Sequence, residues 1–199
     1  MEVDKIRQMS IVQGTGGVRQ VGRFLLLSKA DALREQIKRQ CTVALQGMPP
    51  FLNAFVLTSL SGGTGGGCFL DVCYIIRDVM KELGLKSEID GLFFLPDVAT
   101  ANPAVAAVPA VVEHCFANGY AALKELDYLM GLWEEQDWFC QNYGTFSVKT
   151  QDPPVNQCCL LSARKADGSL LADGLERSIH AAVYAIVTRM ARGEKPDWD

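Results

Sequence analysis

Residues 58–71 read TSLSGGTGGGCFLD, and five of the six residues from Gly62 to Gly67 are glycine. A short apolar stretch that favours a β-strand, 53–60, comes before them, and residues 69–83 follow with the spacing of an amphipathic helix. Ordered glycine costs conformational entropy wherever it occurs. Five glycines between a buried strand and a helix therefore call for a structural or functional reason.

An anion site is the interpretation that this position favours. The first turn of a helix has main-chain N–H groups without partners, and the helix dipole adds positive potential there. Glycines allow the backbone to approach an anion closely, so the segment Ser61–Gly67 predicts a phosphate-binding loop to which Thr64 adds a hydroxyl. The alternative is a flexible connection that binds nothing, but a tight strand-to-helix turn needs fewer glycines than this.

Two common phosphate motifs do not fit. The P-loop needs a lysine followed by serine or threonine after its last glycine, whereas Cys68 and Phe69 follow Gly67. The dinucleotide pattern GxGxxG, started from Gly63, would place its third glycine at Cys68.

The rest of the chain alternates between strand and helix patterns. Further buried strands are expected at 89–95 and 157–163, and helices at 23–45, 103–130 and 171–190, with a break or kink possible at Asn118–Gly119. The aromatic segment 132–146 is expected to be a loop or a short helix. Strand, helix and strand in this order predict an α/β fold: a three-layer, Rossmann-type domain with a mainly parallel sheet and helices on both faces.

Composition limits the class of protein. The chain has 199 residues, which suits a single domain, and its formal net charge of −4 argues against a nucleic-acid binder. No apolar stretch reaches the length of a membrane span. The seven cysteines form no CxxC pair, so reduced thiols in a cytoplasmic protein are expected rather than zinc ligands or disulfides.

Gly62–Gly67, placed after a buried strand, resembles the glycine loop of the tubulin/FtsZ superfamily, usually written GGGTGTG or GGGTGSG. Gly66 stands where that family has threonine or serine. A second stretch, Gly14–Arg23, reads GTGGVRQVGR and is similar to the FtsZ segment that carries GAG and then VGR. The residues ALKEL at 122–126 also resemble bacterial tubulin-like proteins.

The resemblance implies a GTPase-domain-like fold, binding of GTP or GDP with Mg²⁺ as a candidate ion, and self-association into cytoskeletal filaments. In that family the segment matched by Gly14, Thr15, Gly16 and Gly17 meets the terminal phosphate. The segment matched by Ser61, Gly62, Gly63, Thr64, Gly65, Gly66 and Gly67 holds the phosphates. Asp97, which ends the second strand, is a candidate for ribose or for magnesium through water, although capping of the next segment explains it equally well.

The resemblance is expected to be incomplete at both ends of residues 1–199. The first strand with its own glycine loop and the second domain with its acidic, water-activating loop have no counterpart. We therefore expect weak nucleotide binding at most and no turnover by this chain alone. The asparagine that contacts guanine in the family is also not evident, which leaves the base open.

Other candidates have simpler explanations. Arg23 could neutralise phosphate, but it also suits a solvated position at the start of a helix. His114 and Cys115 suggest a metal or a nucleophile, yet ordinary helix positions explain them better, and His180 suits a surface pair with Glu176. The rival function is an interaction module that binds a protein partner through 132–146 rather than nucleotide. An unrelated α/β enzyme that uses the glycine loop for another phosphorylated ligand is the third possibility.

Overall fold

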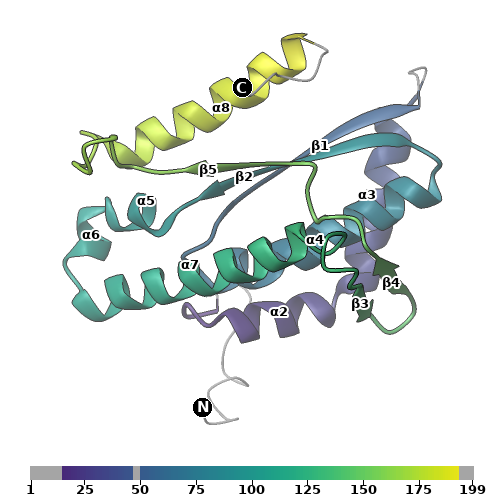
Figure 1. The fold of residues 1–199 in the computed structure, drawn as a ribbon, viewed down its shortest axis with the longest axis horizontal. Helices are drawn as coiled ribbons and strands as arrows, with labels where there is room; N and C mark the ends of the chain where they lie inside the picture. Colours follow the sequence, from purple (N-terminus) through teal and green to yellow (C-terminus); the bar gives the residue numbers. More distant parts are fainter. Residues whose placement is uncertain (1–14, 47–49, 193–199) are drawn as a thin grey trace.

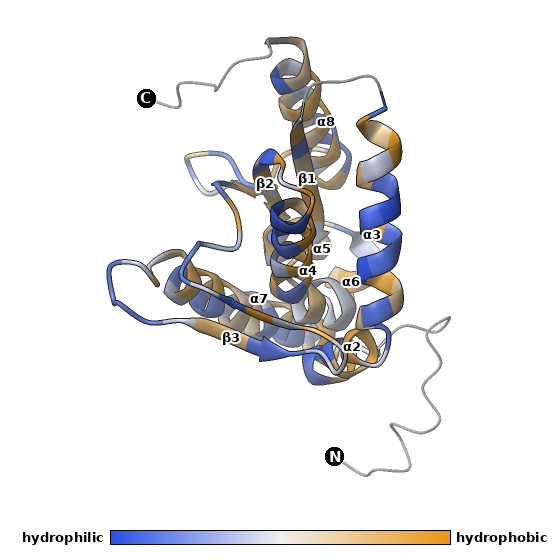
Figure 2. Cartoon of the chain, turned by 90° about the vertical axis from the view of Figure 1, so that its right-hand side faces the viewer, coloured by the Kyte–Doolittle hydropathy of each residue, from blue (hydrophilic) through white to orange (hydrophobic). Residues whose placement is uncertain are grey.

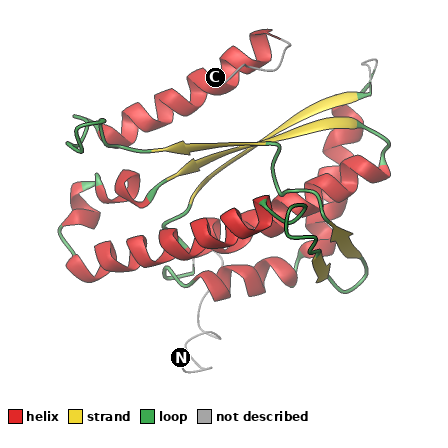
Figure 3. Cartoon of the chain, viewed as in Figure 1, coloured by secondary structure: helices red, strands yellow, loops and turns green. Residues whose placement is uncertain are grey.

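The computed structural model describes residues 15–46 and 50–192. The elements follow one another in the order α2 (Arg19–Leu27), α3 (Ala30–Ala44), β1 (Phe51–Ser59), α4 (Gly63–Glu82), β2 (Lys86–Phe94), α5 (Pro96–Thr100), α6 (Pro103–Ala106), α7 (Pro109–Met130), β3 (Phe139–Asn142), β4 (Ser147–Thr150), β5 (Gln157–Leu161) and α8 (Gly174–Arg192) (Figure 1). The expected α/β fold, in which helices flank a parallel sheet, is confirmed. Figure 3 separates the sheet from a small hairpin at one side of the molecule.

The central sheet has three parallel strands in the order β1-β2-β5. The first crossover is α4, which returns the chain from the end of β1 to the start of β2. The second contains α5, α6, α7 and the hairpin, and it leads to β5. Because all three strands run in the same direction, their carboxyl ends meet at one edge, beside the start of α4.

Alternate residues of β2 define the two faces of this sheet. Ile89 and Phe93 are fully buried in a core cluster with residues of α4 and α7, where Phe69 lies edge-on to Phe93. Glu88 and Asp90 project to the other face, where Arg189 of α8 contacts both. Helices α4 and α7 therefore cover one face of the sheet, and α8 lies against the other (Figure 1).

A second core cluster lies on the far side of α4. Tyr74 and Ile75 pack there with Ala30 of α3 and with Tyr143 and Val148 of the hairpin. Tyr74 stacks on Phe139 with ring centroids 3.7 Å apart. Helix α4 thus has buried residues on two sides, which explains why its apolar pattern is broad for a surface helix.

Several boundaries differ from the sequence prediction. The helix expected over 103–130 is divided into α6 and α7. The helix expected over 23–45 is two helices, because the chain turns at Ser28, whose hydroxyl donates to the Leu25 carbonyl at 2.7 Å. The break predicted at Asn118–Gly119 is wrong: α7 runs through it, and Gly119 is needed because a Cβ there would overlap Pro96. The expected loop over 132–146 contains β3 and the turn to β4, an antiparallel pair.

The last helix is amphipathic, as predicted, but most of its apolar face is exposed. Ala182 is fully buried, whereas Ile179, Val183, Tyr184 and Val187 are all more than two-fifths exposed. Figure 2 shows α8 at one extremity of the molecule, with apolar residues among its outward-facing ones. Periodicity predicted the stripe correctly, but it did not predict how little of that stripe is covered in this chain.

Candidate functional site

The segment that precedes α2 makes a tight turn. The Val18 N–H donates to the Thr15 carbonyl at 3.0 Å, and Gly16 and Gly17 both have positive φ angles, 57° and 82°. Successive residues with positive φ are typical of a turn that only glycine and a few polar residues tolerate. Gly14, which was predicted to belong to the same loop, lies outside the described residues.

The predicted loop Ser61–Gly67 is mostly helix. Ser61 and Gly62 alone precede α4, and residues 63–67 form its first turns. Gly62 is the N-cap, and no side chain caps the helix. The N–H groups of Gly63, Thr64 and Gly65 therefore have no acceptor within the helix. The sequence predicted that a helix follows the glycines, but α4 begins within them, at Gly63.

Most of these glycines allow backbones to pack closely. A Cβ on Gly63 would lie 2.5 Å from the Val18 nitrogen and 2.6 Å from the Gly17 carbonyl carbon. A Cβ on Gly67 would overlap the carbonyl oxygen of Arg19 and lie 3.0 Å from its carbon. These contacts let α2 lie directly against the first turns of α4, so the two glycine-containing segments of the sequence meet in space.

Two more glycines pack against the end of β1. A Cβ on Gly65 would lie 2.6 Å from the Ser59 carbonyl oxygen, and one on Gly66 would lie 2.6 Å from that of Leu60. Gly62 is different, because a Cβ there would meet no atom within 4 Å. Its φ of −92° and ψ of 160° also suit any residue. Gly62 is thus the glycine of this run that borders open space.

The Thr15 turn and the start of α4 lie in contact at the carboxyl edge of the sheet. Thr15 is buried, and its hydroxyl lies 3.5 Å from that of Thr64, which is exposed. Ser61 is buried as well, and its hydroxyl lies 2.8 Å from that of Ser59. We call Thr15–Gly17 together with Ser61–Gly65 the cradle.

Asn118 also belongs to this site, although the sequence reasoning treated it only as a helix break. Its side chain is 8% exposed, and its amide nitrogen donates to the Gly17 carbonyl at 2.7 Å and to the Ser61 carbonyl at 2.9 Å. His114, one helical turn earlier, places its Nε2 2.9 Å from the same Gly17 oxygen. A lone asparagine inside an alanine-rich helix has no pattern that could have revealed this role.

Asp97 lies in the first turn of α5, at the end of β2. Its Oδ2 accepts the Ser162 hydroxyl at 2.5 Å and the Ala163 N–H at 2.8 Å. The carboxylate is buried, and it joins the end of β2 to the segment after β5. The described contacts of Asp97 are therefore those of a residue that fixes the edge of the sheet.

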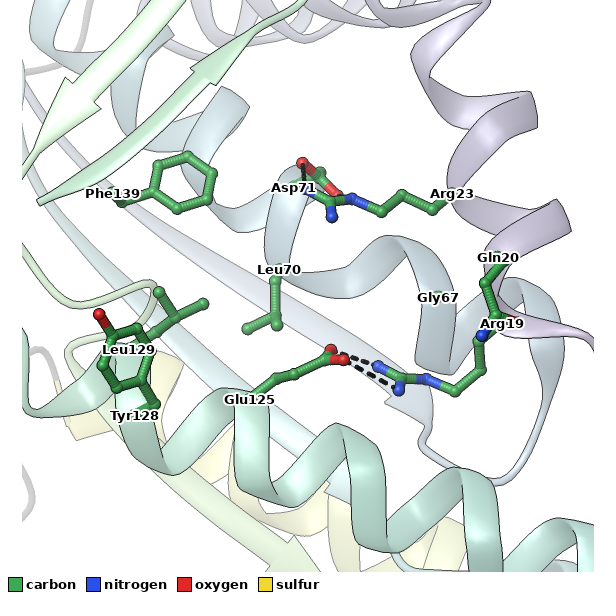
Figure 4. A pocket seen from close by; sticks show the side chains of 10 residues that line it. All are labelled: Arg19, Gln20, Arg23, Gly67, Leu70, Asp71, Glu125, Tyr128, Leu129 and Phe139. Carbon is green, nitrogen blue, oxygen red and sulfur yellow. Dashed lines mark hydrogen bonds and ion pairs between the residues drawn. The ribbon is translucent and has the colours of Figure 1, made fainter.

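A cavity of about 340 Å³ lies beside the cradle, between α2, α4, α7 and β3. Arg19 of α2 pairs there with Glu125 of α7, with one nitrogen–oxygen distance of 3.1 Å (Figure 4). Arg23 pairs with the buried Asp71 at 2.9 Å, and Tyr143 donates to the same carboxylate at 2.8 Å. The hydrogen bond to Asp71 raises the pKa of Arg23. With Arg19 paired to Glu125 as well, both guanidinium groups that line this cavity already have a carboxylate partner within the protein.

Two of the thiols, Cys73 and Cys68, lie on α4. Burial raises the pKa of Cys73 to about 12 and that of Cys68 to about 11, so both stay protonated at neutral pH. Within residues 15–46 and 50–192, no group of three or more histidine, cysteine or acidic side chains could hold a metal ion. The helices of this described part include none that is long and apolar enough to cross a membrane.

The sequence profile of one protein family, described as tubulin like, matches residues 2–193. The chain belongs to the tubulin-like family. This match covers both glycine-containing segments and all of the described helices and strands. No curated protein and no solved structure matches the chain significantly.

Membership of the tubulin-like family confirms the resemblance that the two glycine motifs indicated. The segments that carry this resemblance, 15–23 and 62–67, are in contact in the structure although about forty residues separate them in the sequence.

Proposed function

We propose that this tubulin-like chain binds the phosphate groups of a guanine nucleotide in the cradle, with Mg²⁺ accompanying the phosphates. The observation that carries the proposal is the start of α4. This helix of 20 residues begins at the carboxyl edge of the sheet with no side-chain cap, and a Cβ on its N-cap, Gly62, would meet no atom within 4 Å. An uncapped helix N-terminus combines unpaired N–H donors with the positive end of the helix dipole.

The proposed roles differ among the residues of the cradle. The N–H groups of Gly63, Thr64 and Gly65 would donate to phosphate oxygens, and the exposed Thr64 hydroxyl would add a donor. Gly62 leaves room for the anion. The turn at Thr15–Gly17, with Gly14 before it, would face the terminal phosphate, as the family resemblance implies. Gly66 and Gly67 support the site through packing rather than through contact with the ligand.

Family membership supports guanine as the base, and it supports assembly into filaments as the larger function. Hydrolysis requires a group that orients water at the terminal phosphate. In the family this group comes from a neighbouring subunit, so the proposal for this chain is nucleotide binding, with turnover only in an assembly that supplies the acid.

Isothermal titration of the purified chain with GTP, ATP and inorganic phosphate, each with magnesium, tests the proposal. Selective binding of GTP is the expected result, with weaker binding of phosphate alone. Equal binding of GTP and ATP would support a phosphate site in another kind of α/β protein. No heat with any of the three would contradict the proposal.

A second candidate function is protein binding, which the segment after α7 favours. Trp133 is 74% exposed and Trp138 is about half exposed, whereas Tyr143 of the same segment is buried. Tryptophan is enriched among the residues that dominate protein interfaces. Sedimentation of the chain over a range of concentrations, alone and as Trp133→Ala, tests this function, because loss of association in the variant would assign a partner surface to 132–146.

A further inference from the structure

We propose that Asn118 of α7 is a positioning residue that holds the two halves of the cradle at the separation a phosphate needs. The inference rests on the proposed function and adds a residue to it that neither glycine motif contains. Asn118 belongs to α7, a helix of 22 residues that includes neither glycine segment.

The geometry assigns the orientation of this amide. Both groups that it meets, the carbonyls of Gly17 and Ser61, can only accept hydrogen bonds. The side-chain nitrogen, with two hydrogens, must therefore face them, and each hydrogen has one acceptor. The 8% exposed side chain leaves water little access to either bond.

The two acceptors belong to peptides at the turn before α2 and at the start of α4. Gly17 is followed by Val18, whose N–H closes the turn, and Ser61 is followed by Gly62, the N-cap of α4. A carbonyl that points at Asn118 fixes the plane of the peptide that also carries the next N–H. The Asn118 amide thus sets the orientation of one peptide in the Thr15 turn and of one peptide at the start of α4.

His114 strengthens the same contact. Its Nε2 lies 2.9 Å from the Gly17 oxygen, so an Nε2–H tautomer gives this carbonyl a second donor from α7. A Cβ on Gly17 would lie 2.9 Å from the His114 ring. Helix α7 therefore clamps the Thr15 turn through two side chains, and Asn118 extends that clamp to α4.

The test compares Asn118→Asp with the wild type and with Asn156→Leu. Asp has the same shape as Asn but presents only acceptors at neutral pH, so both bonds are lost. Asn156 is the matched control. Its Oδ1 accepts the Ile89 N–H at 3.0 Å, and this bond joins the middle of β2 to the residue before β5, away from the carboxyl edge of the sheet. Thermal unfolding of all three proteins establishes that each is folded.

Two measurements follow on the folded proteins. In Asn118→Asp, the dissociation constants for GTP and for inorganic phosphate should rise about tenfold or more, and Asn156→Leu should leave them unchanged. Amide hydrogen exchange should become about tenfold faster in 15–18 and 61–66 together in Asn118→Asp only. The inference would be overturned if amide exchange in both segments of Asn118→Asp equalled that of the wild type. It would also be overturned if exchange became faster while the dissociation constants stayed unchanged.

These readouts separate the two proposals. If the wild type binds neither ligand, the proposed function fails, but hydrogen exchange still decides whether Asn118 holds the two segments. If Asn118→Asp does not fold, Asn118→Leu takes its place, because leucine removes both donors without adding a charge.

Discussion

The contact between α2 and α4 and the contact between α8 and the sheet are made in opposite ways. In the first, glycines bring two backbones together: Gly63 and Gly67 leave no room for a Cβ. In the second, the helix keeps most of its large apolar residues exposed, and a buried ion pair, Arg189 with Asp90 at 2.5 Å, fixes it to the sheet. A glycine-rich segment is thus the most tightly packed part of the site, whereas an apolar helix is the loosely covered one.

The largest expected effect is from Gly67→Ala. The new Cβ would overlap the Arg19 carbonyl oxygen, which is main chain and has no rotamer to change, so α2 must move away from α4. We expect a loss of about 3 kcal/mol or more in the free energy of unfolding, measured by urea denaturation.

Gly62→Ala is the matched control for that experiment. It adds the same methyl group in the same run of glycines, but it meets no atom within 4 Å. Its free energy of unfolding should fall by about 1 kcal/mol or less, since alanine is a poorer N-cap than glycine. Equal losses in the two variants would contradict the distinction between packed and open glycines.

The next effect in size is from Arg189→Met at the other contact. Removing the arginine leaves Asp90 buried without its partner, which should cost about 3 kcal/mol of unfolding free energy at pH 7. Burial already raises the pKa of Asp90 above its ordinary value, with Arg189 opposing that shift.

The sign of the pH dependence follows from that raised pKa. A carboxyl with a higher pKa in the folded state binds its proton more tightly there, so its contribution to stability is lost as pH rises through the folded pKa. Arg189→Met should therefore recover part of its lost stability when the pH is lowered from 7 towards 5. Thermal melts over that range measure this, and a loss that does not change with pH would contradict it.

The smallest effect is expected on the exposed face of α8. Val187→Lys should change the unfolding free energy by less than about 0.5 kcal/mol, because this side chain is more than half exposed. Ala182 of the same helix is fully buried, so Ala182→Lys would bury a charge and should be severely destabilising. Similar effects from both substitutions would show that α8 is covered in solution in a way that the described contacts do not include.

The sequence was sufficient for the order of the β1–α4–β2 unit, because apolar strand patterns and a helical period are strong local signals. The burial expected for the first strand was wrong, since β1 lies at an edge of the sheet and only its Val56 is buried. It was not sufficient for the hairpin, since Phe139 and Tyr143 are held by Tyr74 and Asp71, more than sixty residues away. The turn at Ser28 was also missed, because the apolar period continues across it with only a drift in phase.

The sequence predicted where the candidate site lies, but not what each of its glycines does. The glycine run marked where α4 begins, but a run of letters cannot separate Gly62, which borders open space, from Gly67, which touches another backbone. That distinction depends on α2, which is placed by tertiary packing. Asn118 was invisible for the same reason, since its two acceptors come from segments 101 and 57 residues away.

The central claim is that the open start of α4 at Gly62 holds phosphate, and Gly62→Asp tests it most directly. Aspartate at an N-cap with φ −92° and ψ 160° would accept the free N–H groups itself, which should raise the unfolding free energy by about 0.5 kcal/mol. The same carboxylate would occupy and repel the anion site. Titration with GTP and magnesium, beside a melt of each protein, should therefore show a more stable protein that no longer binds. Binding equal to the wild type in a folded Gly62→Asp variant would contradict the account.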